Sequence, residues 1–592
     1  MINRPPSTDS QPPTTDHRLP TTHSWKNDFY LWLPLACVSW WLAWKYQDRF
    51  ISDWDGFDYT ASVVEETYSV LGLGRALFLG YNRLLWQAAS SWFHWPPEQV
   101  YLLIRYGVIA QTGVAIIGIY ALCKELSASK LSAFFSALIV VASPYFITYS
   151  GRAMSEIPGF LMLSWSLWWM LRGLRLGRQW QFLMAAFLVG LSANVREFAV
   201  FYFPFVALAA WWRGVKWRTV ALALALTGLA AGAGILFWYL RDGNLYRDAV
   251  ITWYRLSAEE RRRFPVSINN IWFLGKFTFI ASATVAVLVP LALAWLASKR
   301  RLRLLWMFGL CGLLADLVLL LNHDLPVNPR YALTGLLGLA AVSGWCLAEL
   351  LRGGRIHNKS ANLASVQALS PQRRGERRGS AEREFESQTS WSKNNKLKSW
   401  TEGAQRVWRN LCETSAELCA SAVKKIPGSI VSRLTLPSFS WRGVLILLSL
   451  IVMTKATWNY EAKELYSAEW NANGALRFIA QVERLPWNTG FIVGQRSPLI
   501  HYFSAIGVQP YWRTISPGSG WPDGKLDKAI ADFFYAGREV YIDFDPEIWQ
   551  TGVRENSREA AGLEMIRRHY ELKFISDNFY QVLCKKPGLA EP

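Results

Sequence analysis

Apolar residues dominate the chain in long runs between about residue 29 and residue 351, and short polar or charged stretches separate these runs. A helix that crosses the hydrocarbon core of a bilayer needs roughly 17–25 mostly apolar residues, and fewer where flanking side chains reach the interface. The pattern therefore predicts a polytopic α-helical membrane protein with about eleven transmembrane spans. The predicted spans are 29–46, 100–123, 131–150, 157–171, 180–194, 198–212, 219–240, 271–298, 304–321, 331–351 and 441–458.

Two segments outside these runs have patterns of their own. In the connection 47–99, the run ALFLGYNRLLWQAASSWF is amphipathic with Arg83 near its centre, which predicts a helix lying in the membrane interface. In 459–592, GFIVGQ, EVYIDF and YELKFI have the pattern of short strands, and LDKAIADFFYAG and SREAAGLEMIRRH that of helices. We expect 459–592 to form a small α/β domain outside the membrane, after a last span at 441–458.

Basic residues are unevenly distributed among the connections. Alternate connections are rich in Lys and Arg, and the positive-inside rule places such connections in the cytoplasm. The outward-facing connections are then 47–99, 151–156, 195–197, 241–270, 322–330 and the chain after about residue 459. The basic residues of the cytoplasmic connections are Lys124, Lys130, Arg172, Arg175, Arg178, Arg213, Lys216, Arg218, Lys299, Arg300, Arg301 and Arg303.

Composition fits a membrane protein, since the 592 residues are 52% hydrophobic and include 32 Trp. The net charge of +19 would suggest nucleic acid on a soluble chain. Here, however, 17 Lys and Arg against 7 Glu between Arg352 and Arg442 supply 10 of these charges. That segment contains PQRRGERRGSAEREFESQTS, which predicts a basic, low-complexity cytoplasmic insert at 352–440 beside anionic membrane lipid. No nucleic acid partner is expected.

The remaining compositional features set further limits. Residues 1–28 are rich in Pro and Thr and predict a disordered cytoplasmic tail. The seven Cys are scattered, so they imply neither a metal site nor a disulfide framework.

Three carboxylates follow the first predicted span in ISDWDGFDYT: Asp53, Asp55 and Asp58. A carboxylate just outside the bilayer can act as general base toward a hydroxyl, which contributes roughly 10²–10⁴-fold in rate, and burial there would raise its pKa. Asp53 and Asp55 could instead hold a divalent cation such as Mg²⁺ or Mn²⁺. The structural alternative is a solvated turn, since Asp-Trp-Asp-Gly is a favourable turn sequence.

Two other short connections on the same side are charged. GRAMSE has Arg152 and Glu156 four residues apart, which as a local exposed ion pair would contribute only a few tenths of a kcal/mol. ANVREFA has Arg196 and Glu197 near headgroup depth, where charges are costly unless they are paired or face a cavity.

The connection before the tenth predicted span combines a histidine, an acid and an arginine. NHDLPVNPRY brings together His323, Asp324 and Arg330, and an arginine suits bidentate contact with a phosphate. Asp316 precedes it inside the ninth span, where its cost of up to ~3 kcal/mol predicts a functional or interhelical partner.

These residues converge on one membrane face. Carboxylates suit activation of a hydroxyl, arginines suit phosphate, and the neighbouring Trp54, Phe57 and Tyr59 suit stacking on a sugar. The joint interpretation is a transferase in the plasma (inner) membrane with an extracytoplasmic active site and a lipid-linked phosphosugar donor.

The sequence resembles the GT-C membrane glycosyltransferases, in the branch of protein O-mannosyltransferases and aminoarabinose transferases. The resemblance extends over 29–351, as a transmembrane catalytic domain, and the outward C-terminal domain. The matching motifs are DWDGFDY in a long first outer loop, GRAMSE before the fourth span, and HDLPVNPRY before the tenth.

The resemblance implies an inverting transfer from a polyprenyl-phosphate sugar to a protein, lipid or glycan acceptor. It implies that Asp55 is the general base, with Asp53 as the alternative, and that Arg330 contacts the donor phosphate. Many members have an Asp-Glu pair where this chain has Asp55-Gly56, so a second acid would have to be Asp53 or Asp58, and a divalent cation stays an open expectation. The remaining candidates for substrate binding are Arg152, Glu156, Arg196, His323, Asp324 and Tyr59.

Three other functions remain as alternatives. A transporter or flippase of a lipid-linked or anionic solute would place its charges near the midplane and not at one face. A glycan ligase or polymerase would share the donor chemistry but move whole glycans. A structural scaffold would not need the acid cluster.

Overall fold

The computed structural model describes residues 28–48, 50–51, 53–69, 75–263, 268–321, 329–352, 443–460, 485–486, 488–493, 513–515, 525–543, 558–576 and 579–584. Most of the predicted tail 1–28 and of the predicted insert 352–440 therefore lies outside the described residues. The chain divides into two compact units, Met1–Trp345 with Thr457–Pro592, and Cys346–Ala456.

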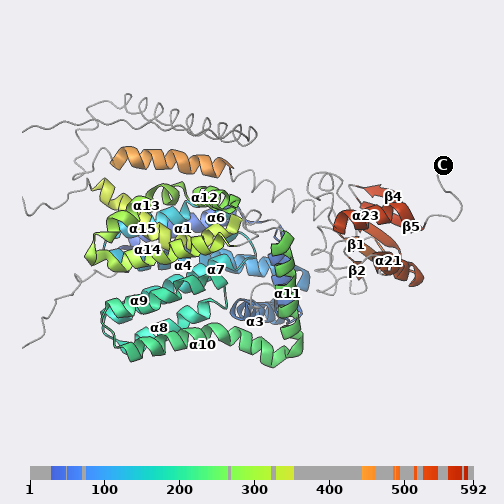
Figure 1. The fold of residues 1–592 in the computed structure, drawn as a ribbon, viewed down its shortest axis with the longest axis horizontal. Coiled ribbons are helices and arrows are strands. Elements are labelled where there is room, and N and C mark those ends of the chain that lie inside the picture. The colour runs from blue at the N-terminus through green and yellow to red at the C-terminus, as the bar shows by residue number, and fades with distance from the viewer. Residues whose placement is uncertain are drawn as a thin grey trace, which may run out of the picture. The chain divides into compact units, whose positions relative to one another are not determined.

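The first part of the chain is a bundle of helices (Figure 1). Every predicted apolar run forms helix. The α-helices are α1 (Phe29–Lys45), α2 (Trp54–Val64), α3 (Ala76–Phe93), α4 (Val100–Ser127), α5 (Lys130–Val141), α6 (Pro144–Ser150), α7 (Glu156–Arg175), α8 (Gln179–Ser192), α9 (Phe203–Trp212), α10 (Trp217–Asp242), α11 (Asn244–Arg263), α12 (Asn269–Ala281), α13 (Ala283–Ala297), α14 (Arg303–Leu319), α15 (Leu333–Leu351) and the helix Gly443–Tyr460. Short 3₁₀ helices are η2 (Pro97–Gln99), η3 (Glu197–Tyr202), η4 (Arg300–Leu302) and η5 (Pro329–Ala332).

The bundle confirms a polytopic membrane fold. Five of the described helices are long and apolar enough to cross a membrane, or up to seven if each of two bent helix pairs is one span. Several other predicted spans form shorter helices, such as α8 with 14 residues and α9 with 10. Length and composition alone therefore support fewer crossings than the eleven predicted.

Two predicted spans are broken by local capping. The run 131–150 forms α5 and α6, bent by 66°, because Ser143 caps α6 through the Phe146 amide and Pro144 cannot continue α5. The run 271–298 forms α12 and α13, bent by 107°, because Ser282 is extended and its side chain accepts from the Val285 amide. Each of these two runs is therefore a bent pair of helices, which passes the length and composition test for a span only when its two helices are taken together.

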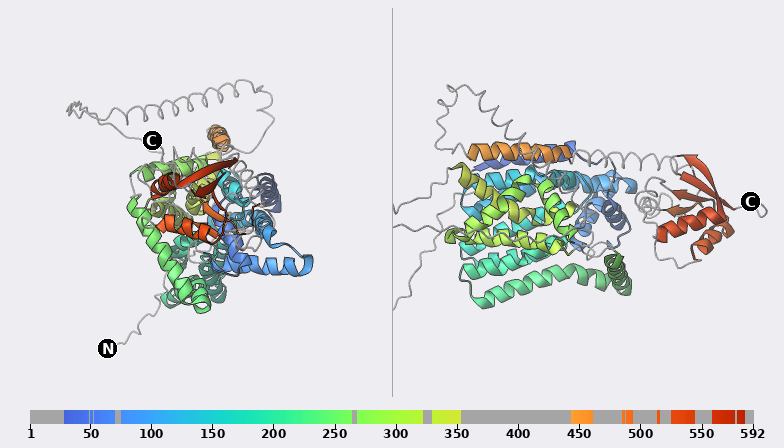
Figure 2. Two further views of the ribbon diagram at one scale, coloured as in Figure 1. Left: turned by 90° about the vertical axis from the view of Figure 1, so that its right-hand side faces the viewer. Right: turned by 45° about the horizontal axis from the view of Figure 1, so that its top comes forward.

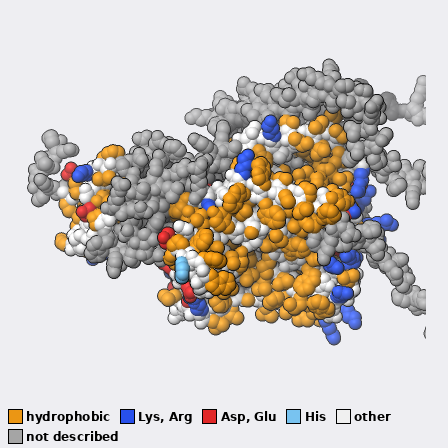
Figure 3. All heavy atoms as spheres, turned by 180° about the vertical axis from the view of Figure 1, so that it is seen from behind, with side chains coloured by type: hydrophobic (Ala, Val, Ile, Leu, Met, Phe, Trp, Pro, Cys, Tyr) orange, Lys and Arg blue, Asp and Glu red, His pale blue; other side chains and the backbone are white. Residues whose placement is uncertain are grey.

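Charge is segregated along the bundle. Figure 3 shows an apolar body with Lys and Arg side chains gathered at one end, and Asp and Glu side chains toward the opposite end. This is the separation on which the outward-facing assignment of the acidic connections depends.

Helices α3, α4, α7, α8 and α10 pack against one another. Helix α7 packs against both α4 and α8, α10 packs against α8, and α3 contacts α4 and α10 (Figures 1 and 2). Helix α3 forms over the amphipathic run predicted from the sequence.

The C-terminal residues form a five-stranded mixed sheet, which confirms the predicted α/β domain. Its strand order is β2-β1-β3-β5-β4, with β1 parallel to β2 and β3, and β5 antiparallel to β3 and β4. Its core contains Ile492, Ile530, Ile542, Ile566 and Val582. The elements are β1 (Gly490–Val493), β2 (Arg513–Ile515), α21 (Lys525–Tyr535), β3 (Val540–Asp543), α23 (Arg558–His569), β4 (Tyr570–Ser576) and β5 (Phe579–Cys584).

Candidate active site

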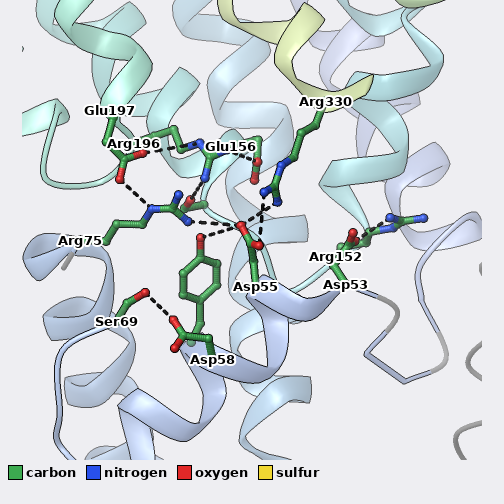
Figure 4. A network of polar contacts seen from close by, with 12 residues as sticks. Asp53, Asp55, Asp58, Ser69, Arg75, Arg152, Glu156, Arg196, Glu197 and Arg330 are labelled. Carbon is green, nitrogen blue, oxygen red and sulfur yellow. Dashed lines mark hydrogen bonds and ion pairs between the residues drawn. The ribbon is translucent and has the colours of Figure 1, made fainter. Parts of the chain in front are cut away.

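Asp55 and Arg330 form the centre of a buried network of charges (Figure 4). Arg330 donates from Nη1 to Asp55 Oδ2 at 2.6 Å and from Nη2 to Oδ1 at 3.2 Å, so the guanidinium grips both carboxylate oxygens. Asp55 lies in the first turn of α2, and Arg330 lies in η5 immediately before α15. The structure thus brings together the two residues to which the resemblance assigned the base and the phosphate contact.

A second arginine, Arg75, reaches the same carboxylate. Its Nη1 lies 3.6 Å from Asp55 Oδ2, while its Nε donates to Glu197 Oε1 at 2.9 Å. The guanidinium stacks over the ring of Tyr59, 5.0 Å from the centroid. Arg75 precedes α3 in a left-handed conformation, with φ of 40°. Sequence reasoning missed this residue, because GLGRALFLGYN offers only one charge beside an amphipathic run.

The local ion pair that was the structural alternative for GRAMSE does not form. Glu156 Oε1 instead lies 2.9 Å from Arg196 Nη2, and Arg196 also donates to Ser155 Oγ at 3.4 Å. Arg196 Nε lies 3.9 Å from Glu197 Oε2, which links this pair to Arg75. Glu156 begins α7 and Arg196 precedes η3, so the contact ties the start of α7 to the connection after α8.

Arg152 pairs with the first-loop acids. Its Nη1 donates to Asp53 Oδ2 at 2.6 Å, and its Nε lies 3.8 Å from Asp48 Oδ2. Gly151 makes this approach possible, because a Cβ there would lie 2.7 Å from Gln47 Cα and 3.0 Å from the Ala43 carbonyl oxygen. We call Asp53, Asp55, Arg75, Arg152, Glu156, Arg196, Glu197 and Arg330 the charged cluster.

The turn interpretation of Asp-Trp-Asp-Gly is wrong, because these residues open helix α2. Asp53 is its N-cap residue but makes no side-chain capping hydrogen bond, since its carboxylate pairs with Arg152. A Cβ on Gly56 would lie 2.8 Å from Ile51 Cγ2 and 3.6 Å from the Ala153 carbonyl oxygen. The glycine therefore lets α2 pack closely against its neighbours.

Tyr59 does not fit the expected role in sugar stacking. Its side chain is fully buried, its hydroxyl donates to Asp55 Oδ2 at 3.4 Å, and its ring faces Arg75. Tyr59 therefore contacts both Asp55 and Arg75, and its ring has no exposed face on which a sugar could stack. His323 and Asp324 lie outside the described residues, as does the Trp54 side chain.

Burial alone would raise the pKa of Asp55, as the sequence led us to expect. The structure gives the opposite direction: desolvation is outweighed by the charges of Arg330, Arg75 and Arg196, so the pKa lies below its ordinary value of 3.8. While these arginines surround it, Asp55 is a stable anion and a weak base.

Two guanidinium groups keep unused donors beside this carboxylate. Arg330 Nε is buried and makes no hydrogen bond, and Arg75 Nη1 is buried and makes none either, although it lies 3.6 Å from Asp55 Oδ2 in an ion pair. A buried charged donor without an acceptor is costly, so both groups favour an anionic ligand such as phosphate.

The cluster does not fit a divalent cation. Asp53 and Asp55 each bind a guanidinium, and Asp58 accepts from Ser69 Oγ on the other side of α2 (Figure 4). In the part of the chain that the structure describes, no group of three metal-ligating side chains converges. Each acid of the cluster has an arginine nitrogen within 2.9 Å, so none of the four carboxylates is free to bind a cation.

Asp316 has an interhelical environment. It is buried in α14 and faces α15, where a Cβ on Gly335 would lie 2.2 Å from its Oδ1. The glycine provides the space for this carboxyl between the two helices.

Comparison with known proteins identifies the fold. The family model described as dolichyl-phosphate-mannose-protein mannosyltransferase matches residues 99–238. ArnT from Cupriavidus metallidurans bound to undecaprenyl phosphate is similar in structure, with a TM-score of 0.51 and 14% identity over 96% of this chain and 100% of that chain. The oligosaccharyltransferase of Archaeoglobus fulgidus in its apo form has a TM-score of 0.46 and 11% identity over 93% of this chain and 74% of that chain.

No curated protein matches the sequence. The chain has the fold of the ArnT structure, which is the fold that the resemblance to the GT-C membrane glycosyltransferases implied.

Proposed function

We propose that this protein is a membrane glycosyltransferase that moves a sugar from a polyprenyl-phosphate carrier to an acceptor hydroxyl at the extracytoplasmic face. The single observation that carries the proposal is the contact between Asp55 and Arg330, which joins a proton acceptor and a phosphate-binding group from distant parts of the chain. The matched family model and the bound undecaprenyl phosphate of the ArnT structure favour the same donor class.

Donor binding begins at the arginines. The donor phosphate accepts hydrogen bonds from Arg330 and from the Nη1 donor of Arg75. On Arg330 it takes the place of the Asp55 carboxylate, and both acceptors are negatively charged. The same guanidinium groups stabilise the charge that grows on the phosphate as its bond to the anomeric carbon breaks.

Phosphate binding also changes Asp55. While Arg330 grips both oxygens, the carboxylate is a poor base, because its pKa is held low. When the phosphate takes over Arg330, Asp55 loses its main cation and gains an anionic neighbour, and both changes raise its pKa. The donor itself thus converts Asp55 into a base.

The transfer then follows from these positions. Asp55 accepts the proton of the acceptor hydroxyl, whose oxygen forms a bond to the anomeric carbon. The bond from that carbon to the phosphate oxygen breaks, and its electron pair stays on the polyprenyl phosphate. Attack on the face opposite the phosphate inverts the anomeric configuration. Asp53 stays the alternative base, since it is also paired with an arginine and its side chain is more exposed than that of Asp55.

Arg152 and Arg196 have positioning roles in this proposal. Arg152 fixes the start of α2 through Asp53, and Arg196 fixes the start of α7 through Glu156. Both contacts hold the elements that carry Asp55 and its surroundings.

The test is a transfer assay with purified protein in lipid nanodiscs, a set of radiolabelled polyprenyl-phosphate sugars, and protein, lipid and glycan acceptors. We expect a glycosidic product with inverted configuration from the wild type, and loss of turnover by about 10²–10⁴-fold in Asp55→Asn but not in Asp53→Asn. Movement of the intact donor across the bilayer without a glycosidic product would support a flippase and end the enzyme proposal. Transfer only from oligosaccharide donors would identify a glycan ligase.

A further inference from the structure

Three arginines surround one carboxylate at the end of the bundle opposite the charged cluster. Arg172 and Arg175 lie in the last turn of α7, Arg213 directly follows α9, and Glu125 lies in the last turn of α4. Glu125 Oε1 lies 3.1 Å from Arg175 Nη1, and Glu125 also interacts electrostatically with Arg213 and Arg172. We call these four residues the basic cluster. Its three guanidinium groups share a single carboxylate, which leaves a surplus of positive charge.

Two of the arginines have donors to offer. Arg213 Nε is buried and makes no hydrogen bond with the described residues. Burial lowers the pKa of Arg213 below its ordinary value, and the attraction of Glu125 does not make up for it. The Arg172 guanidinium lies over the Trp168 ring, 5.3 Å from its centroid, a contact that holds the group in place without using its N–H donors.

The helix ends explain this arrangement only in part. The partial negative charges at the C-termini of α4, α7 and α9 favour cations here. They do not give Arg213 Nε an acceptor, and a buried charged donor without an acceptor is costly. An anion that accepts from Arg213 would remove this cost.

Exposed tryptophans indicate that the basic cluster lies at the depth of lipid headgroups. Trp180 near the start of α8, Trp211 near the end of α9 and Trp217 at the start of α10 are all largely exposed, and tryptophan is enriched at membrane–water interfaces. Helix α7 has 20 residues, so about 30 Å separate Arg175 from Glu156 at its other end, close to the thickness of the hydrocarbon core. The positive-inside rule assigns the arginine-rich end to the cytoplasmic leaflet.

We propose that the basic cluster binds the phosphate of an anionic phospholipid of the cytoplasmic leaflet. Arg213 Nε and the guanidinium of Arg172 donate to the phosphate oxygens, while Arg175 stays paired with Glu125. A lipid phosphate fits better than a soluble one, because the surrounding tryptophans place these donors in the headgroup layer, and basic sites between membrane helices on this side take such headgroups. The bound lipid ties the ends of α7 and α9 together. The site does not depend on the proposed function, and its test needs no sugar donor.

The test measures the Kd of phosphatidylglycerol and of phosphatidylcholine for the purified full-length chain by native mass spectrometry. Both lipids have a phosphodiester, but only phosphatidylglycerol has a net negative charge, so we expect the wild type to bind it roughly tenfold more tightly. Arg213→Gln should raise the Kd of phosphatidylglycerol about tenfold, through loss of a charge-assisted hydrogen bond. Arg218→Gln is the control, because Arg218 is exposed near the same end of the bundle and its substitution changes the net charge equally.

Glu125→Gln gives a second, independent measurement. The Glu125 carboxylate competes with the lipid phosphate for the arginines, so its neutralisation should lower the Kd of phosphatidylglycerol several-fold. A Kd that stays the same or rises would show that the basic cluster serves the fold alone, and would reject the site. This measurement also decides the question if Arg213→Gln fails to fold.

Inorganic phosphate distinguishes the lipid from a soluble anion. At constant ionic strength, an excess of inorganic phosphate should not displace bound phosphatidylglycerol, and displacement would assign the basic cluster to a soluble phosphate and reject the lipid. Equal Kd values for phosphatidylglycerol and phosphatidylcholine, or for Arg213→Gln and Arg218→Gln, would also overturn the proposal.

Discussion

Asp55 and Arg330 are 275 positions apart in the chain and meet in a two-pronged ion pair with both side chains largely buried. Each is the other's principal partner, and each is the group that the proposed reaction needs free. Donor phosphate and Asp55 therefore compete for one guanidinium. A substitution of Asp55 can therefore abolish turnover without weakening donor binding.

Asp55→Asn should lose transfer and yet bind polyprenyl phosphate at least as tightly as the wild type. The amide is neutral and grips Arg330 more weakly, so the phosphate no longer displaces an anion, and we expect up to about tenfold tighter binding. Native mass spectrometry or a fluorescence competition assay with polyprenyl phosphate measures the affinity. Asp248→Asn is the matched control, because the Asp248 side chain is 64% exposed and lies outside the charged cluster, and its affinity should stay at the wild-type value. Weaker binding in folded Asp55→Asn would show that Arg330 needs the carboxylate to hold it in place.

The same ion pair makes stability depend on pH. The folded pKa of Asp55 is depressed below 3.8, so the unfolded chain binds a proton first as the pH falls. The contribution of Asp55 is fully present above the ordinary value and is lost as the pH falls through the folded pKa. Differential scanning fluorimetry between about pH 6 and pH 3 should show a smaller acid-induced drop in Tm for Asp55→Asn than for the wild type. Parallel curves would mean that the pair does not stabilise the fold.

Arg75→Gln should weaken donor binding even though no motif marks this residue. The substitution removes a buried charged donor next to Asp55, and loss of one charge-assisted hydrogen bond to phosphate corresponds to about a tenfold higher Kd. Glu197 keeps Arg196 as a neighbour at 3.9 Å, which limits the damage to the fold. Arg247→Gln, in which an exposed arginine next to Asp248 is removed, is the control. An unchanged Kd with a lowered Tm would assign Arg75 a structural role.

A chelator should not affect transfer. Asp53 and Asp55 both bind arginine, and the described residues bring no third ligand to them. Turnover after treatment with EDTA should equal that of untreated protein, and added Mg²⁺ or Mn²⁺ should not increase it. A chelated enzyme that regains lost activity only with a divalent cation would contradict this expectation.

Much of this arrangement could be predicted from the sequence, because charge and apolarity act over short distances along the chain. The apolar runs predicted the helices. The alternation of basic connections predicted that Asp55, Arg152, Arg196 and Arg330 lie on one face of the bundle. A local ion pair between Arg152 and Glu156 was the structural alternative that their spacing left open. The pair does not form, because Glu156 begins α7 while Arg152 precedes it in a non-helical connection, so the two do not share a helix face.

Other features depend on contacts that a local pattern does not contain. Arg75 joins the cluster through Asp55 and Glu197, from segments far apart in sequence. The direction of the Asp55 pKa shift depends on three arginines from three connections, so burial alone gave the wrong sign. The break at Ser143-Pro144, by contrast, carries a local signal that hydropathy does not weigh.

Close packing around Gly56 leaves no room for an acidic side chain next to Asp55. Any side chain there begins with a Cβ that would lie 2.8 Å from Ile51 Cγ2, and Ile51 is buried. Gly56→Ala should gain about 1 kcal/mol from helix propensity but lose about 1–3 kcal/mol from overpacking, so we expect a net loss of stability.

The double variant separates these two effects. Ile51→Ala removes the methyl group that Cβ would meet, so in that background Gly56→Ala should become neutral or stabilising, with a coupling energy of about 1 kcal/mol or more. Chemical denaturation or Tm measurements on the four proteins of this cycle give the coupling. Additive effects would show that Ile51 moves aside freely, and Gly56→Glu should then be tolerated as well.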